Sequence, residues 1–438
     1  MDATPQARIV SVNQYGEAIC AGAARISTTP GSALEIFEAA KESAGNFQLI
    51  KKVLQSGHRS ILEHAVFSIA LWNVSAFAEQ FFIEFRLASF TVKSRRYVDF
   101  SGQGYYVPSG LSDGARNRYC HYMDRLFDAY RRLLSLGAPK EDARFLLPYA
   151  FHSSFFCTLN ARELVRLINA ARARGIPELS DIAGQLARQL EELFPNAAAL
   201  LHAEAVPEPD GVAPEDGCVL VSPEDAGKVF PLQGPQQPEA LLEAAWRTAR
   251  PGAGTLDLKT LAASERPREL EQLTYCFSID GISLPALTHL ARHRMQSIVI
   301  PPLERIGRGR LIIPKSVADR PDWREIYENA LAGAFEERAK VNRDPELRKY
   351  GFYCLASATL TSVVTTMNAR ELQLFIRLRS CSRAQWEIRG VALRMLETVE
   401  PSFPELFRFY GPACRVTGVC PEGALSCGRV LGTKSTRE

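Results

Sequence analysis

The sequence has almost no net charge and no segment typical of secreted or membrane proteins. Its 52 basic and 49 acidic residues leave a formal charge of +3 over 438 residues, which argues against a general nucleic-acid coat but leaves room for local phosphate sites. No apolar run reaches the roughly 18 residues that span a bilayer, and the N-terminus lacks the basic and then apolar pattern of a signal peptide. We therefore predict a cytoplasmic protein that binds neither nucleic acid nor membranes.

Several motifs of common enzyme classes are also missing. There is no GxGxxG and no GxxxxGKS/T sequence, so a dinucleotide would not be held by a Rossmann or a Walker loop. The GxSxG elbow of α/β-hydrolases is absent as well. His58, Glu63 and His64 come close together in the chain, but their spacing is not that of HExxH. We predict no metal site there.

The ten cysteines lack the spacing of a disulfide framework. They are scattered along the chain, and we interpret most of them as buried thiols. Cys414, Cys420 and Cys427 differ because they lie in a Gly/Pro-rich tail, without a CxxC pair or a nearby histidine. We predict that this tail packs as a loop or a lid, with a zinc site as the weaker alternative.

Two stretches of the chain nearly repeat one another. Residues 85–89 (FRLAS) are echoed by 293–297 (HRMQS), and residues 159–164 (LNAREL) by 367–372 (MNAREL). Both pairs lie 208 positions apart, a spacing far longer than that of solenoid repeats. The chain is therefore predicted to carry two tandem copies of one domain.

A Pro/Gly-rich stretch separates the two copies. Residues 203–239 hold seven prolines, as expected of a linker. We place copy one at 8–202 and copy two, which includes the cysteine tail, at 240–430. Helical periodicity dominates each copy, as at 115–136, while alternation at 65–71 indicates a short strand, so the predicted fold class is α+β.

The densest cationic group in the chain is Arg292-His293-Arg294. In an extended backbone, alternation would place both arginines on one face and His293 on the other. Two guanidinium forks on one face suit a phosphate or a pyrophosphate. A solvated surface triad is the alternative, and the register of the triad with the repeat counts against it.

The NAREL element of copy two predicts a helix that presents an arginine from its apolar face. Asn368, followed three residues later by Glu371, is a capping box. Arg379 continues the apolar stripe of this helix, whereas copy one has Ala171 at the same position. An inward arginine needs an anionic partner, either a carboxylate such as Glu387 or a bound phosphate, and the sequence leaves both open.

These motifs resemble those of the flavin-dependent thymidylate synthase family. The matching segments are RHRxxS, NAREL, RLR and AQWEIR in copy two, GHxSxxEH, SxRY and YxP in copy one, and CPEG in the tail, at residues 292–297, 368–372, 377–379, 384–389, 57–64, 94–97, 106–108 and 420–423. The resemblance covers most of both copies. It implies a mixed, largely antiparallel sheet with helices, and a homotetramer whose active sites are shared between subunits.

The resemblance also implies an activity and a set of site residues. Family members use FAD, NADPH and methylenetetrahydrofolate to methylate dUMP to dTMP, with the hydride supplied by reduced flavin and no attack by an enzyme cysteine. The implied FAD contacts are Arg292, His293, Arg294, Asn368, Arg370, His58 and Glu63. The implied nucleotide contacts are Ser94, Arg96, Arg144 and Arg379, of which Ser94 and Arg379 are the catalytic candidates.

Neither copy matches the family pattern completely. Copy one has Glu84 and Phe85 where the family has Arg and His, and copy two departs at three nucleotide positions, with Pro302, Glu304 and Phe352. Because the losses are complementary, we predict one composite site that takes residues from both copies. The chain would then form a homodimer that imitates the family tetramer.

Three other functions stay open at this point. A divergent flavin-dependent enzyme could act on another pyrimidine nucleotide, because Val92 stands where the family commonly has a carboxylate. A non-catalytic flavin- or nucleotide-binding protein is the second alternative. An RNA-binding surface is the third, and it is disfavoured because no aromatic stacking platform accompanies the arginines.

Overall fold

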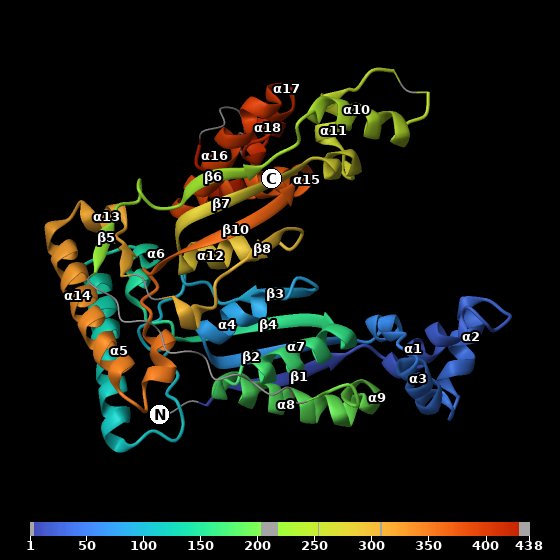
Figure 1. The fold of residues 1–438 in the computed structure, drawn as a ribbon, viewed down its shortest axis with the longest axis horizontal. Helices are drawn as coiled ribbons and strands as arrows, with labels where there is room; N and C mark the ends of the chain where they lie inside the picture. Colours follow the sequence, from blue (N-terminus) through green and yellow to red (C-terminus); the bar gives the residue numbers. More distant parts are fainter. Residues whose placement is uncertain (1–3, 203–217, 253, 307–308, 429–438) are drawn as a thin grey trace. The chain divides into compact units, whose positions relative to one another are not determined.

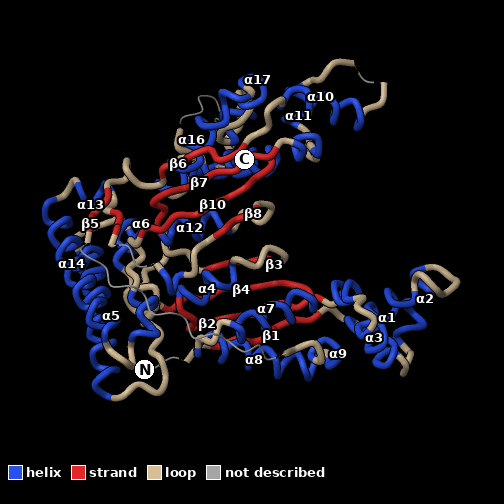
Figure 2. Tube along the Cα trace, in the orientation of Figure 1, coloured by secondary structure: helices blue, strands red, loops and turns tan. Residues whose placement is uncertain are grey.

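The computed structural model describes residues 4–202, 218–252, 254–306 and 309–428. The chain divides into two compact units, one formed by Met1–Val212 with Glu336–Ala356 and the other by Ala213–Phe335 with Ser357–Glu438. Each unit is built around an antiparallel sheet, drawn as arrows in Figure 1 and as red segments in Figure 2. None of the helices in the described ranges combines the length and the apolarity that crossing a bilayer requires.

The first unit contains a four-stranded sheet in the order β1-β2-β4-β3. The strands, all antiparallel to their neighbours, are β1 (Gln6–Val12), β2 (Val66–Ser75), β3 (Ala88–Val92) and β4 (His152–Asn160). The helices are α1 (Gly16–Arg25), α2 (Ala33–Lys41), α3 (Asn46–Gln55), α4 (Ala76–Ile83), α5 (Asp113–Ser135), α6 (Lys140–Ala143), α7 (Ala161–Ala173), α8 (Pro177–Leu193) and α9 (Pro195–Ala198), with 3-10 turns η1 (Arg59–His64) and η2 (Arg144–Leu146).

The second unit contains an equivalent sheet in the order β6-β7-β10-β8. Its strands are β6 (Lys228–Gln233), β7 (Thr274–Ser283), β8 (Ser297–Val299) and β10 (Leu360–Asn368), and a separate parallel pair joins β5 (Val219–Val221) to β9 (Arg310–Ile312). The helices are α10 (Pro238–Ala249), α11 (Leu258–Ala263), α12 (Leu284–Ala291), α13 (Lys315–Ala318), α14 (Pro321–Arg343), α15 (Ala369–Arg379), α16 (Trp386–Val399), α17 (Pro404–Phe407) and α18 (Ala413–Thr417). The 3-10 turns are η3 (Arg268–Gln272), η4 (Leu303–Arg305), η5 (Arg348–Cys354), η6 (Glu400–Ser402) and η7 (Gly423–Leu425).

The structure confirms the tandem repeat and the α+β fold. Strands β2 and β7, helices α4 and α12, strands β4 and β10, and helices α7 and α15 begin 208 positions apart. The two helices also bury the same positions: α7 buries Leu164, Leu167 and Ile168, and α15 buries Leu372, Phe375 and Ile376, as an apolar stripe at helical spacing requires. The repeat in sequence therefore corresponds to a repeat of secondary structure.

Two features differ from the boundaries drawn on the sequence. Residues 219–221 and 228–233 were assigned to the linker, but they form β5 and β6, and β6 pairs with β7 at the edge of the second sheet. Proline density misled the assignment, because Pro231 lies in an edge strand, where a missing N–H is tolerated. In addition, residues 336–356 belong to copy two by sequence but to the first compact unit by contacts.

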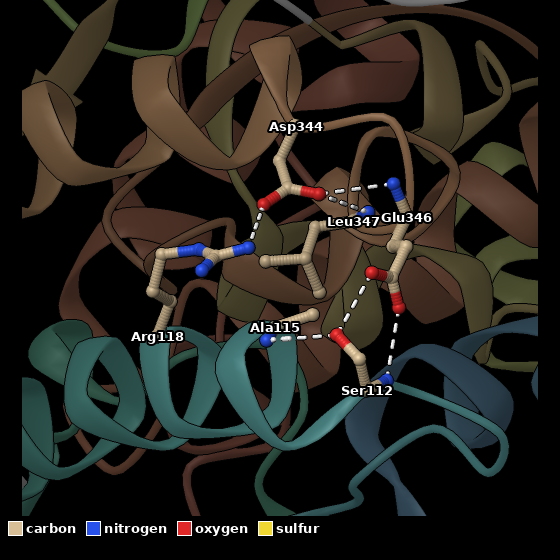
Figure 3. A network of polar contacts seen from close by, with 6 residues as sticks. All are labelled: Ser112, Ala115, Arg118, Asp344, Glu346 and Leu347. Atoms are coloured by element: carbon tan, nitrogen blue, oxygen red, sulfur yellow. Dashed lines mark hydrogen bonds and ion pairs between the residues drawn. The ribbon is translucent and has the colours of Figure 1, made fainter.

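Polar contacts connect the segment 336–356 to helix α5. Ser112 caps α5 by accepting a hydrogen bond from the N–H of Ala115, and its own N–H and hydroxyl donate to the carboxylate of Glu346 at 2.9 and 2.8 Å. Arg118, one turn further along α5, forms an ion pair with Asp344 (Figure 3). The capping residue of one helix thus also anchors a segment that lies more than two hundred positions away in the sequence.

A buried carboxylate connects helices α4 and α8 in the first unit. Glu178 accepts hydrogen bonds from the Ser75 N–H (2.7 Å), the Ser75 hydroxyl (2.6 Å) and the Tyr353 hydroxyl (2.7 Å). In the second unit Glu387 accepts from the N–H and the hydroxyl of Ser283 in the same way. Burial raises the pKa of Glu178 to about 7, although the three donors oppose this shift.

The raised pKa of Glu178 makes stability depend on pH. Between its ordinary pKa of 4.5 and the folded value of about 7, the folded protein keeps a proton that the unfolded chain has released. The free energy of unfolding should therefore fall as the pH rises through this interval, by a few kcal/mol in total. Glu178→Gln removes the titration, so urea unfolding of variant and wild type should give a stability difference that shifts in favour of the variant between about pH 5 and about pH 8. A difference that stays constant over this range would contradict the expectation.

Candidate functional site

His293 lies at the centre of a polar chain in the second unit. Its Nε2 accepts a hydrogen bond from Nε of Arg379 at 3.0 Å, so its Nδ1 carries the proton and donates to Oε1 of Glu371 at 3.2 Å. The ring also packs edge-on against Phe375, with 4.8 Å between ring centroids. Burial and the charge of Arg379 lower the pKa of His293, while Glu371 opposes the shift. His293 is therefore a neutral side chain that orients the Arg379 guanidinium.

The end of helix α12 explains why His293 points inward. Arg292 is the C-cap residue of α12 and keeps helical dihedral angles, and the following residues form a turn before β8. His293 is buried, Arg292 is half-buried and Arg294 is exposed. The sequence analysis expected this separation from an extended backbone, whereas a turn at the end of a helix produces it.

Helix α15 supplies Glu371 and Arg379. Asn368 caps this helix by accepting a hydrogen bond from the N–H of Glu371 at 2.9 Å, which is one of the two hydrogen bonds of the predicted capping box. The Glu371 carboxylate contributes to the His293 chain. The sequence left two kinds of partner open for Arg379, a carboxylate such as Glu387 or a bound phosphate. In the structure, the Glu387 carboxylate accepts hydrogen bonds from Ser283. The sequence analysis missed the Arg379–His293 contact because it joins residues on two different elements.

Two of the expected flavin contacts take part in equivalent ion pairs. Arg370 binds Glu271 at 2.5 Å in the second unit, and Arg162 binds Glu63 at 2.5 Å in the first. These pairs join the start of α15 to η3 and the start of α7 to η1. His58, which precedes η1, is exposed. Arg370 and Glu63 therefore have a structural partner in addition to any ligand.

The first unit brings together the expected nucleotide residues Ser94, Arg96 and Arg144. Ser94 opens the loop after β3 and accepts a hydrogen bond from the N–H of Arg96 at 3.3 Å through its hydroxyl. The Arg96 guanidinium pairs with Glu141, with 3.1 Å between Nε and Oε1. Arg144 lies in η2 and donates from Nε to the carbonyl oxygen of Glu141 at 3.0 Å. Glu141 is a member of this cluster that the sequence analysis missed, although it precedes Arg144 by only three positions.

Arg144 is the most informative member of this cluster. Its side chain is only 4% exposed, and its Nη2 is a buried nitrogen without a hydrogen-bond partner among the described residues. Burial, and to a lesser extent the nearby charge of Arg95, lower the pKa of Arg144 to about 10 against the opposing effect of Glu141. A buried donor left unpaired is costly, so this geometry suits an anion that would accept from Nη2.

The cysteine tail lies against the end of helix α15. Residues of both segments line a cavity of about 310 Å³ in the second unit, and Cys381, Cys414, Cys420 and Cys427 are among them. All four are free thiols. Across the described ranges of the chain, no three histidine, cysteine or acidic side chains come together in a metal-binding arrangement.

Comparison with known proteins gives a consistent result for both copies. The family described as "Thymidylate synthase complementing protein" matches residues 8–196 and 235–405. A protein of Geobacter sulfurreducens named "Flavin-dependent thymidylate synthase" is 34% identical over 224 residues, which cover 47% of this chain and 96% of that protein. A protein of the same name from Sulfurisphaera tokodaii is 42% identical over 151 residues, which cover 33% of this chain and 57% of the relative.

The chain also has a distant structural similarity to a solved protein. A UMP/dUMP methylase PolB from Streptomyces cacaoi, bound with 5-Br dUMP, shares 22% sequence identity and a TM-score of 0.39, over 45% of this chain and 94% of the other. A similarity this low does not bear on function. The family is shown by the match over both copies.

Proposed function

Because the chain belongs to the thymidylate synthase complementing protein family, we propose that it is a flavin-dependent thymidylate synthase that methylates dUMP to dTMP. The names of its relatives and the match over residues 8–196 and 235–405 support the reaction class. The buried, unpartnered Nη2 of Arg144 is the observation that carries the nucleotide assignment. FAD is the proposed cofactor, with NADPH or NADH and methylenetetrahydrofolate as co-substrates.

Copy one is proposed to bind the phosphate of dUMP. Arg144 would donate from Nη2 to a phosphate oxygen, and Arg96 would add a second guanidinium to which Glu141 already gives a fixed orientation. Charge-assisted hydrogen bonds of this kind are short and strong. The Ser94 hydroxyl, at the start of the same loop, is proposed to contact the nucleotide.

Copy two is proposed to bind FAD. Its donor set fits the cofactor, because half-buried Arg292 and exposed Arg294 offer two guanidinium forks for the pyrophosphate, on either side of neutral His293. The other proposed FAD contacts are Asn368 and Arg370 of copy two, together with His58 and Glu63 of copy one. When bound, the reduced flavin supplies the hydride. Arg379, oriented by His293, is proposed to stabilise negative charge on the pyrimidine.

The two copies carry complementary parts of this machinery. Copy one has the nucleotide residues and lacks the Arg-His pair, since Glu84 and Phe85 stand in its place, while copy two has the cationic triad and Pro302 and Glu304 at the nucleotide positions. We therefore propose that each active site takes residues from both copies, in a homodimer that imitates the family tetramer. Full dUMP binding by a chain that lacks Ser94 or Arg379 would contradict this composite site.

Complementation of a thymidine-requiring bacterium tests the proposed function. Expression of the chain should allow growth without thymidine, and the purified protein should show flavin absorbance. An otherwise identical chain with Arg379→Ala and Ser94→Ala should give no growth at equal expression. A colourless protein, or growth that is independent of these two residues, would refute the proposal.

Val92 favours one second candidate, an enzyme of the same chemistry that acts on another pyrimidine nucleotide. This residue ends β3, directly before the loop that begins at Lys93, where the family commonly has a carboxylate. Product analysis with dUMP and UMP offered at equal concentration separates the two functions. Preferential methylation of UMP would favour the second.

A further inference from the structure

Copy one contains a buried ion pair between helix α4 and the loop after β3. Arg95, 6% exposed, donates from Nη2 to Oε1 of Glu79, which is 1% exposed. The Ser153 hydroxyl donates to the other carboxylate oxygen of Glu79. The Arg95 guanidinium also lies over the ring of Phe151, at 5.1 Å from its centroid. Both oxygens of Glu79 are therefore occupied, and the pair is shielded from water.

In copy two, apolar side chains occupy the positions equivalent to this ion pair. The positions that correspond to Glu79 and Arg95, 208 residues later, are Leu287 and Leu303, and both are buried. Removing two charges from water is costly, and replacement of a buried ion pair by apolar residues is often neutral or stabilising. The leucine pair shows that this fold accepts the apolar solution. Stability alone therefore does not account for the charges in copy one.

The position of Arg95 in the chain suggests what the ion pair does. Arg95 lies between Ser94 and Arg96, the two residues of the loop that are proposed to meet the nucleotide. The loop leaves β3 with the Lys93 N–H bonded to the carbonyl of Ser154 at 3.0 Å, and it turns with the Val98 N–H bonded to the carbonyl of Ser94 at 3.0 Å. Between these two points, the Arg95 side chain is the anchor that fixes the loop to α4.

The two arginines of the loop have different partners. Arg96 pairs with Glu141, at 18% and 24% side-chain exposure, whereas Arg95 is committed to Glu79 in the interior. Copy two lacks the charged anchor and also has Pro302 and Glu304 in place of Ser94 and Arg96. The buried ion pair thus occurs in the copy that carries the functional loop.

We propose that Glu79 and Arg95 are positioning residues, which hold Ser94 and Arg96 in the geometry that receives the phosphate of the nucleotide substrate. This inference rests on the proposed function. Arg95 does not itself bind the phosphate, because its side chain is buried and already paired. Its effect reaches the substrate through the backbone of the two neighbouring residues.

The double variant Glu79→Leu/Arg95→Leu, which reproduces the apolar pair of copy two, tests the proposal. The KM for dUMP should rise about 10-fold or more, because a small displacement of binding groups has a large effect on their function. The kcat at saturating dUMP, the flavin content and the unfolding midpoint should stay close to wild type. Calorimetric titration with dUMP should show the same loss of affinity as the KM.

A charge pair in the second unit provides a matched control. Asp280 and Arg310 are each about one third exposed and lie 3.2 Å apart, and neither is assigned to a ligand. Asp280→Leu/Arg310→Leu also removes one acidic and one basic side chain, but it should leave the KM for dUMP unchanged.

A second variant covers the case in which Glu79→Leu/Arg95→Leu does not fold. Glu79→Gln keeps the shape of the side chain and should also raise the KM for dUMP, by a smaller factor.

The outcomes separate this inference from the proposed function. Wild-type protein that does not bind dUMP would overturn the proposed function and this inference with it. Wild-type protein that binds dUMP, with a double variant of equal KM, would overturn the positioning role alone. A variant that loses flavin and unfolds at lower temperature in parallel with its loss of dUMP affinity would also overturn it, because that pattern belongs to a purely structural pair.

Discussion

Replacing Arg144 by methionine should weaken dUMP binding by about 30-fold or more while leaving the protein at least as stable as wild type. Loss of one partner of a buried, hydrogen-bonded charge pair costs about 2–5 kcal/mol of binding free energy. Without ligand, Arg144 is a buried guanidinium whose Nη2 has no partner among the described residues, and burial already lowers its pKa to about 10. Removing such a charge relieves a desolvation cost in the free protein. Titration calorimetry with dUMP and urea unfolding measure the two effects.

Arg394→Met is the control for Arg144→Met, and the opposite result is expected. The Arg394 guanidinium donates to the carbonyl oxygens of Gly227 and Ala226, at 2.8 and 2.9 Å, so this arginine is satisfied by the protein itself. Its loss should lower the free energy of unfolding by about 1–3 kcal/mol and leave the dUMP affinity unchanged. If Arg144→Met also destabilised the fold and kept full affinity, Arg144 would be a structural arginine.

Replacing Arg379 by methionine should lower kcat/KM for dUMP by about 100- to 1000-fold, the range found when a preorganised group that stabilises transition-state charge is removed. The same change should raise the pKa of His293, because the charge of Arg379 contributes to its lowering. Steady-state kinetics measure the first effect, and the pH titration of the His293 ring signals by NMR measures the second.

Arg377→Met is the matched control for Arg379→Met. Arg377 lies on the same helix α15, two residues earlier, and its side chain is exposed. The change removes the same charge from the same helix, but it should leave both kcat/KM and the titration of His293 close to wild type. An Arg379→Met protein with wild-type kinetics would remove this arginine from the catalytic site and would contradict a site composed of both copies.

Local patterns were sufficient to predict much of each copy. The alternation at 65–71 predicted strand β2, and the apolar stripe after Asn368 predicted helix α15 together with its capping residue. Such features depend on neighbours within one or two turns of chain, which the sequence displays directly. The prolines of the linker misled the analysis at β6, because a proline at a sheet edge and a proline in a loop look alike in the sequence.

The contacts between side chains of the candidate site could not be predicted from local sequence patterns. His293 is joined to Glu371 and Arg379 across 78 and 86 positions, and Arg95 is joined to Glu79 across a strand and a turn. The sequence analysis placed Arg379 on an inward helix face and could not choose between a carboxylate and a phosphate as its partner. To predict a neutral histidine as that partner, one must know where α12 ends relative to α15, and no periodicity in the sequence shows this.

The sequence by itself determined that this chain consists of two copies of one α+β domain, which residues each copy has lost, and which family its motifs resemble. These properties depend only on the spacing, periodicity and identity of residues along the chain. Only the tertiary structure decided that residues 336–356 join the first compact unit, that Arg144 has a buried and unpartnered nitrogen, and that Glu79 anchors Arg95. Burial and pairing arise when distant segments exclude water together, so they exist only once the chain has folded.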